Sequence, residues 1–200
     1  MTTALGGLRV LDLSAGFAGA IVTQLLADYG ADVVWVEPPG GGPLRSQPAF
    51  PFWQRGKRSA VFDLHDGADR EAVQELARRA DVLVQDWRPG VAETLGLAHD
   101  QLETDAPQLI HVSITGFGTD GPYRDVPGYE PLVLAKLGAL TQFGSVIPRE
   151  GPAYCSMLYA SFGAAQSALQ GLLAALLVRD RCGRGQRVET SLVQGMSAHD

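Results

Sequence analysis

The sequence predicts an α/β fold: a Rossmann-like, open and mainly parallel sheet with flanking helices. Short apolar runs typical of buried strands alternate along the whole chain with segments of helical periodicity. The first three predicted elements, a strand at 8–13, a helix at 20–29 and a strand at 32–37, fit within about thirty residues, the length of a right-handed βαβ unit. Such units build parallel sheets.

The rest of the chain continues this alternation. We expect further strands at 60–64, 82–85, 109–114 and 187–191, and helices at 68–80, 131–140 and 157–179. A short helix starts at Arg88-Pro-Gly, and a helical pattern resumes at Leu192. Glycine, proline and polar residues predict loops at 38–56, 116–130 and 141–152.

The composition excludes several classes of protein. A net charge of −6 without a block of Lys or Arg argues against a nucleic-acid or membrane-surface partner. The first residues lack the basic and apolar segments of a signal peptide, and the longest apolar run, Leu172–Val178, is too short to span a bilayer. The two cysteines and the four histidines (65, 99, 111 and 199) have no metal-binding spacing. We therefore expect a cytoplasmic protein without a metal site.

The first strand–helix turn, Ser14-Ala-Gly-Phe-Ala-Gly, could bind a phosphate or carboxylate through backbone N–H groups at the start of the helix. Glu37 lies 21 residues after Gly16, where a dinucleotide fold places the acid that binds the ribose. The full G-x-G-x-x-G pattern is missing, however. NAD binding and a plain tight turn that packs the helix on the strand both stay open.

Other motifs allow two readings as well. Gly56-Lys-Arg places two cations before a strand, where they could meet phosphates or form a solvated strand entrance. Trp87 follows the end of a strand, where open α/β sheets bind ligands, and could stack on a base or only pack. Gly183-Arg-Gly-Gln could form a phosphate nest, although a helix stop is the simpler interpretation.

Taken in order, the segments resemble the family III CoA-transferases, a group that also contains the 2-methylacyl-CoA racemases. The matching segments run from about residue 8 to 194: GLRVLDLSAGFAGA, LLADYGADVVWVEPPGGGPLR, GKRSAVFDL, ADVLVQDWRPGV, IHVSITGFGTDGPY, PGYE and LLAALLVRDRCGRGQRVETSL. The resemblance implies that residues 1–200 are the N-terminal part of a CoA-binding large domain, with the small domain and the C-terminal return absent. It implies coenzyme A or acyl-CoA as substrate, no metal and no NAD. Members act as interlocked dimers in which an aspartate carries the acyl group as a mixed anhydride.

The resemblance also implies site residues. Its CoA contacts fall on the first turn, on the strand segment that borders the nucleotide and on the turn after the fourth strand: Phe17, Ala18, Phe62, Asp63, Leu64, His65, Asp86, Trp87 and Arg88. Tyr129 and Glu130 match the pair that closes over the thioester. Tyr129 stands where the racemases have a histidine base, which counts against racemase chemistry.

The nucleophilic aspartate of the family is missing. Counting back from the LLAALL stretch places Ser161 or Ala160 at its position, and residues 151–178 contain no Asp or Glu. We therefore expect a subunit that binds CoA or acyl-CoA and takes part in CoA transfer to a small carboxylic acid, in a homo- or heterodimer with a family III homologue that supplies the aspartate. The alternatives are a self-sufficient transferase using Ser161 or Glu130, a non-catalytic CoA-binding remnant or truncated fragment, and a racemase or NAD-dependent dehydrogenase.

Overall fold

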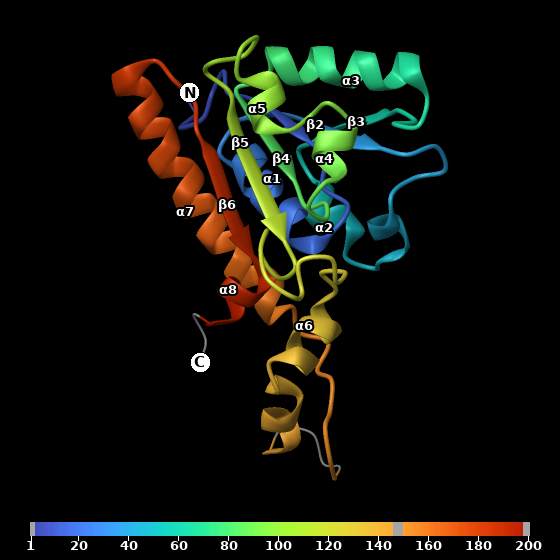
Figure 1. The fold of residues 1–200 in the computed structure, drawn as a ribbon. Helices are drawn as coiled ribbons and strands as arrows, with labels where there is room; N and C mark the ends of the chain where they lie inside the picture. Colours follow the sequence, from blue (N-terminus) through green and yellow to red (C-terminus); the bar gives the residue numbers. More distant parts are fainter. Residues whose placement is uncertain (1–2, 146–149, 198–200) are drawn as a thin grey trace.

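The computed structural model describes residues 3–145 and 150–197, which form a six-stranded sheet covered by helices (Figure 1). The strands are β1 (Arg9–Asp12), β2 (Asp32–Glu37), β3 (Arg58–Val61), β4 (Val82–Gln85), β5 (Ile110–Thr115) and β6 (Arg187–Ser191). Their order is β3-β2-β1-β4-β5-β6, and every pairing is parallel. This order reverses between β1 and β4, the place where open α/β sheets bind ligands at their carboxyl edge. The predicted fold class is confirmed.

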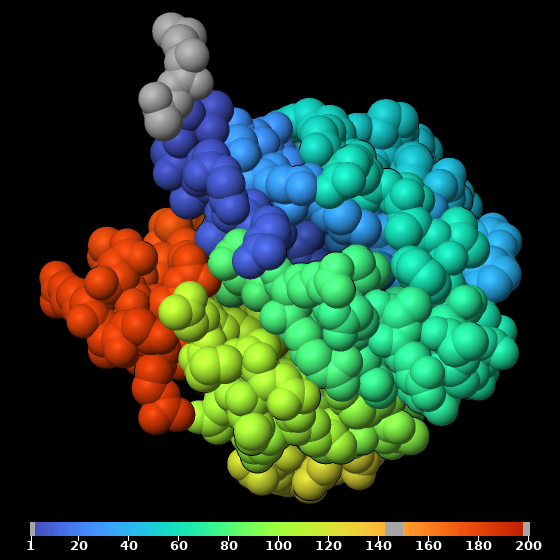
Figure 2. All heavy atoms as spheres, turned by 90° about the horizontal axis from the view of Figure 1, so that it is seen from above, coloured from blue at the N-terminus to red at the C-terminus, as the bar shows by residue number. Residues whose placement is uncertain are grey.

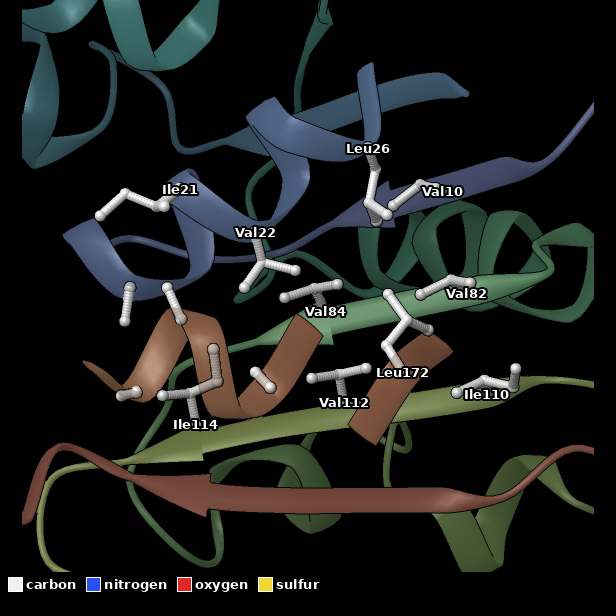
Figure 3. Close-up of a cluster of buried hydrophobic side chains, with 14 of the residues drawn as sticks. Val10, Ile21, Val22, Leu26, Val82, Val84, Ile110, Val112, Ile114 and Leu172 are labelled. Carbon is white, nitrogen blue, oxygen red and sulfur yellow. The ribbon is translucent and has the colours of Figure 1, made fainter. Parts of the chain in front are cut away.

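Two helices cover one face of the sheet: α1 (Phe17–Asp28) and α7 (Tyr159–Cys182). Figure 3 shows the core between them, in which Val22 of α1 and Leu172 of α7 lie over Val84 and Val112. The strands supply alternate residues to this core, because successive side chains of a strand point to opposite faces. Both faces of the sheet are therefore apolar near its centre, as expected for a parallel sheet.

The other face is covered by α3 (Gly67–Arg79) together with the short helices α4 (Val91–Thr94) and α5 (His99–Leu102) (Figure 1). Val73 and Ala77 of α3 pack with Leu11 and Leu83 in a second core. Asp66 caps α3, since its side chain accepts from the N–H groups of Ala68 and Asp69 at 2.9 and 3.0 Å.

A third group of elements extends from the carboxyl edge of the sheet (Figure 1). It contains α6 (Glu130–Lys136) and a 3₁₀ helix, η2 (Ala139–Ser145). The chain then returns to the sheet and enters α7. A last helix, α8 (Leu192–Ser197), follows β6 directly.

Several predicted boundaries need correction. The loop predicted at 38–56 contains a 3₁₀ helix, η1 (Pro43–Ser46), and α2 (Phe50–Gln54). The strand predicted at 60–64 begins two residues earlier, because β3 is an edge strand with mostly exposed side chains and lacks an apolar run. The helix predicted at 131–140 ends earlier, near Gly138, whose φ of +73° is unfavourable for a helix. Residues 146–149 of the predicted loop, and His199, lie outside the described residues.

Helix α7 is long and apolar enough, by length and composition, to cross a membrane. Its inner face instead packs on the sheet and α1, as a core helix does. It ends at Gly183, which has a φ of +72° and is the helix stop that the sequence favoured. Figure 2 shows its C-terminal end projecting beside the N-terminal segment. A cavity of about 540 Å³ lies there, at the amino edge of the sheet, and none of the predicted site residues lines it.

Candidate functional site

The first strand–helix turn already holds a carboxylate. Asp86, which follows β4, accepts from the N–H of Ala15 through Oδ1 and from the N–H of Gly16 through Oδ2, both at 2.8 Å. A Cβ atom on Gly16 would lie 2.9 Å from Asp86 Oδ2, so glycine makes room for this contact. Two N–H groups of the turn thus donate to a carboxylate of the protein itself.

Burial raises the pKa of Asp86 to about 6. The negative charge of the nearby Asp12 adds to this effect, while the two backbone N–H groups oppose it. Asp86 therefore remains mainly ionised at neutral pH. Its charge lies at the switch point between β1 and β4.

The predicted contacts Phe17 and Ala18 begin α1 at this turn. The ring of Phe17 is half-buried and meets the ring of Trp53 edge-on, with centroids 4.8 Å apart. Ala18 has its methyl group in the core, so only its backbone is placed to contact a ligand. Trp53 was not predicted as a neighbour of the turn, since it comes from α2.

Phe62, Asp63, Leu64 and His65 form the turn between β3 and α3 rather than part of the strand. Phe62 and Leu64 pack against the core on the α3 side. The Asp63 carboxylate accepts from the N–H of His65 at 3.0 Å. The N–H of Asp63 donates to the Asp69 carboxylate at 2.8 Å. The imidazole of His65 is left exposed at the carboxyl edge of the sheet.

Glu37 does not have the environment of a ribose-binding acid. Its buried carboxylate accepts from Nε and Nη2 of Arg45, both at 2.6 Å, from the N–H of Gly42 at 3.2 Å, and from the hydroxyl of Ser59. Arg45 is the main reason why the pKa of Glu37 is lowered to about 2. Glu37, whose position suggested an NAD site, therefore uses both its carboxylate oxygens for hydrogen bonds within the protein.

The two cations of Gly56-Lys-Arg are also engaged. Lys57 is buried against Asp12, with Nζ 3.0 Å from Oδ2. Arg58 pairs on the surface with Asp32, the first residue of β2. The hypothesis that both cations meet phosphates directly is therefore not supported.

Trp87 and Arg88 line a cavity of about 500 Å³ on the α4–α5 side of the sheet, at the ends of β4 and β5. Thr115, Thr119 and Arg124 line it as well. His111 forms part of its inner wall; its Nε2 lies 3.1 Å from the carbonyl of Leu97. The cavity brings arginine and hydroxyl donors next to an indole ring.

The side chain of Glu130, the first residue of α6, lies against the first turn of α7, where it contacts Ser161. Its Oε1 accepts from the N–H of Ala160 at 2.7 Å, and its Oε2 accepts from the N–H and the hydroxyl of Ser161 at 2.9 and 2.6 Å. Glu130 and Ser161 are only 6% and 4% exposed. The carboxylate thus caps a long helix by occupying N–H groups that lack helical partners.

Two glycines position Glu130. The backbones of Gly116, after β5, and Gly128 touch: a Cβ atom on Gly116 would lie 2.5 Å from the Cα of Gly128. This contact closes the 116–128 loop onto the sheet, two residues before Glu130. Tyr129, in contrast, is 68% exposed, so the predicted pair splits into a buried acid and a solvent-facing ring.

Within residues 3–145 and 150–197, no group of three or more His, Cys, Asp or Glu side chains could hold a metal ion. The predicted residues lie on one edge of the sheet. One part of this edge consists of the turns after β1, β3 and β4, and the other part consists of the start of α7. Phe17, Ala160 and Ala164 belong to one packed cluster, which joins these two parts.

A parallel sheet of order 3-2-1-4-5-6 with polar loops at its switch point defines a Rossmann-like α/β protein. Residues 5–199 match the model of CoA-transferase family III, and the chain belongs to this family. It is 37% identical over 202 residues to the formyl-CoA:oxalate CoA-transferase of Streptomyces avermitilis, covering 96% of this chain and 48% of that protein. It is 35% identical over 206 residues to the succinyl-CoA–D-citramalate CoA-transferase of Chloroflexus aurantiacus, covering 97% and 50%.

Two solved structures have the same fold as this chain. A hypothetical protein from Mycobacterium tuberculosis superposes with a TM-score of 0.90 at 33% identity, covering 99% of this chain and 57% of that one. A CAIB/BAIF family protein from Brucella suis gives a TM-score of 0.89 at 33% identity, covering 99% and 55%. The chain spans about half the length of the curated relatives it matches.

Proposed function

We propose that this chain binds coenzyme A and its thioesters, in the cytoplasm, and takes part in CoA transfer between a thioester and a small carboxylic acid. The observation that carries the proposal is the convergence of the expected CoA contacts and the expected thioester end on one edge of the sheet. Asp86 and Trp87 follow β4, and Phe17 begins α1 beside them. Glu130 begins α6 and contacts Ser161 in the first turn of α7. Relatives that are named as CoA-transferases support CoA transfer as the reaction at this edge of the sheet.

In this proposal the nucleotide end of CoA lies over the turns after β1 and β3. The N–H groups that begin α1 at Phe17 and Ala18 are oriented to meet phosphate, and the helix dipole favours that charge. His65, exposed after β3, supplies a further contact to a phosphate group. Trp87 and Arg88 line the cavity in which an adenine or pantetheine group is received.

The reaction needs a carboxylate that attacks the thioester carbonyl. The new carboxylate–carbonyl bond forms, the carbon–sulfur bond breaks, and CoA leaves as a thiolate, giving a mixed anhydride. Glu130 is poorly suited to this attack, because both its oxygens accept hydrogen bonds and its side chain is buried. We infer that a partner chain of the family supplies the carboxylate, while this chain binds and orients CoA.

One contact favours a second candidate, in which Ser161 carries the acyl group itself. Its hydroxyl donates to Glu130 Oε2 at 2.6 Å, so the carboxylate could take the proton while Oγ attacks. The carbon–sulfur bond of the thioester would break and CoA would leave as a thiolate, so that the product would be a serine ester rather than an anhydride.

Calorimetry with CoA tests the binding proposal. The purified chain, alone or with an aspartate-bearing homologue, is expected to release heat with CoA and with acetyl-CoA. If neither preparation interacts with either compound, the proposal is wrong.

Mass spectrometry after incubation with acetyl-CoA distinguishes the two candidates. We expect no adduct on this chain and, when the homologue is present, a hydroxylamine-sensitive adduct on the homologue. An acyl group on Ser161, absent in a Ser161→Ala variant, would instead establish the second candidate.

A further inference from the structure

A buried ion pair lies directly beneath the first strand–helix turn. Lys57 Nζ is 3.0 Å from Asp12 Oδ2, and the two side chains are 1% and 0% exposed. The same ammonium group donates to the carbonyl of Ala20 at 3.1 Å. Lys57 thus links the end of β1 to the first turns of α1.

The Asp12 carboxylate holds the turn from below. Its Oδ1 accepts from the N–H and the hydroxyl of Ser14 at 3.0 and 2.5 Å, and its Oδ2 accepts from the hydroxyl of Thr23 at 2.5 Å. Asp86 holds the next two N–H groups, those of Ala15 and Gly16. Three successive N–H groups of the turn therefore bind acidic side chains.

This arrangement creates an electrostatic problem for an anionic ligand. Two carboxylates, Asp12 and Asp86, flank the turn, and both would repel the phosphates of CoA. Lys57 supplies the compensating charge, because its ammonium group contacts Asp12 and interacts electrostatically with Asp86. With Lys57 the three side chains carry a net charge of −1, and without it a net charge of −2.

We propose that Lys57 is a positioning residue for CoA binding, which acts through Asp12 to fix the turn at Ser14 and to offset the two carboxylates where the phosphates approach. This inference rests on the proposed function. It gives the Gly56-Lys-Arg motif a role in recognising phosphate without direct contact.

Four proteins separate the charge effect from damage to the fold: the wild type, Lys57→Met, Asp12→Asn, and the double variant. CoA affinity is measured by calorimetry at about pH 8, where Asp86 is ionised, at low and at high salt. Lys57→Met is expected to bind CoA about tenfold more weakly at low salt, the effect of one charge about 10 Å away in a medium of intermediate dielectric constant. Asparagine at position 12 keeps an acceptor oxygen for the N–H and the hydroxyl of Ser14. The double variant, which restores the net charge of −1, is therefore expected to bind like the wild type, and Asp12→Asn more tightly. High salt should reduce all these differences.

Arg179→Met is the matched control. Arg179 also pairs with an aspartate, Asp81, but at the opposite edge of the sheet. This variant should lower the melting temperature and leave CoA affinity unchanged.

The outcomes are distinguishable. A wild type that gives no heat with CoA contradicts the proposed function. A wild type that binds CoA, with Lys57→Met binding equally well or with no recovery in the double variant, overturns the role of Lys57. If Lys57→Met does not fold, Asp12→Asn decides: CoA affinity no higher than that of the wild type overturns the proposal.

Discussion

The hydroxyl of Ser161 donates to the Glu130 carboxylate at 2.6 Å, at the point where α7 begins. Two N–H groups of the helix donate to the same carboxylate. The acid thus joins α6 to α7 through three hydrogen bonds. The family resemblance predicts that this acid lies near the thioester, and in the structure its carboxylate caps α7.

Replacing Glu130 by Gln should destabilise the protein by about 2 kcal/mol, since an amide has one oxygen acceptor and its NH₂ group would face an N–H donor. Ser161→Ala, which removes one donor, should cost about 1 kcal/mol. Urea unfolding measures both values. Tyr129→Phe is the neighbouring control, because that ring is exposed, and its unfolding free energy should not change. Equal stability of Glu130→Gln and the wild type would show that the cap is dispensable.

The Asp86 carboxyl should make the protein less stable as the pH rises. Burial raises its pKa to about 6 in the folded state, from 3.8, so between about pH 4 and pH 6 the folded protein binds more protons than the unfolded chain. Stability from this group is therefore present at low pH and is lost as the pH rises through 6. In Asp86→Asn this contribution disappears. Subtracting the two urea-unfolding profiles isolates it, and a flat difference would contradict the assignment.

His111 should act in the opposite direction. Burial lowers its pKa to about 4, from 6.5, so the unfolded chain binds more protons between these values. Stability is then lost as the pH falls from about 6.5 to 4. A His111→Gln variant keeps a donor for the carbonyl of Leu97 and should lack this loss. Thermal unfolding at a series of pH values tests it; parallel profiles for variant and wild type would count against the buried neutral imidazole.

The contact between α7 and α8 should not tolerate a methyl group. A Cβ atom on Gly163 would lie 2.1 Å from the carbonyl oxygen of Gly195, so Gly163→Ala forces the helices apart and should cost about 3 kcal/mol. Gly67→Ala is the matched control, because its Cβ would meet nothing nearer than 4.0 Å and alanine favours a helix. Chemical denaturation should show a large loss for the first variant and none for the second.

The sequence predicted those elements best whose side chains are buried. Strand β4 has four buried residues in succession, and its predicted bounds coincide with the structure. Strand β3 was placed two residues late, because its exposed edge has neither an apolar run nor regular alternation. Helix α2 was missed, since Phe50-Pro-Phe-Trp-Gln lies in a segment dominated by proline and glycine.

The site could be predicted only in outline. The family resemblance placed Asp86, Glu130 and Ser161, and the structure brings Glu130 and Ser161 into contact. Pairing between charges could not be predicted, because it depends on side chains brought together by the fold. Lys57 lies 45 positions from Asp12 in the sequence. No pattern in the residues around either of them indicates that the two side chains form a buried ion pair. The roles of the predicted CoA contacts remain predictions.

Strand β6 continues into α8 without an intervening loop. Helix α8 contacts both α7 and the segment that follows β5. Gly195 presses against α7, and the N–H of Val193 donates to the carbonyl of Gly116 at 3.2 Å. Gly116 in turn touches Gly128, next to the segment that carries Glu130. A displacement of β6 would therefore shift Gly116 and Gly128, and with them the start of α6, which carries the Glu130 carboxylate.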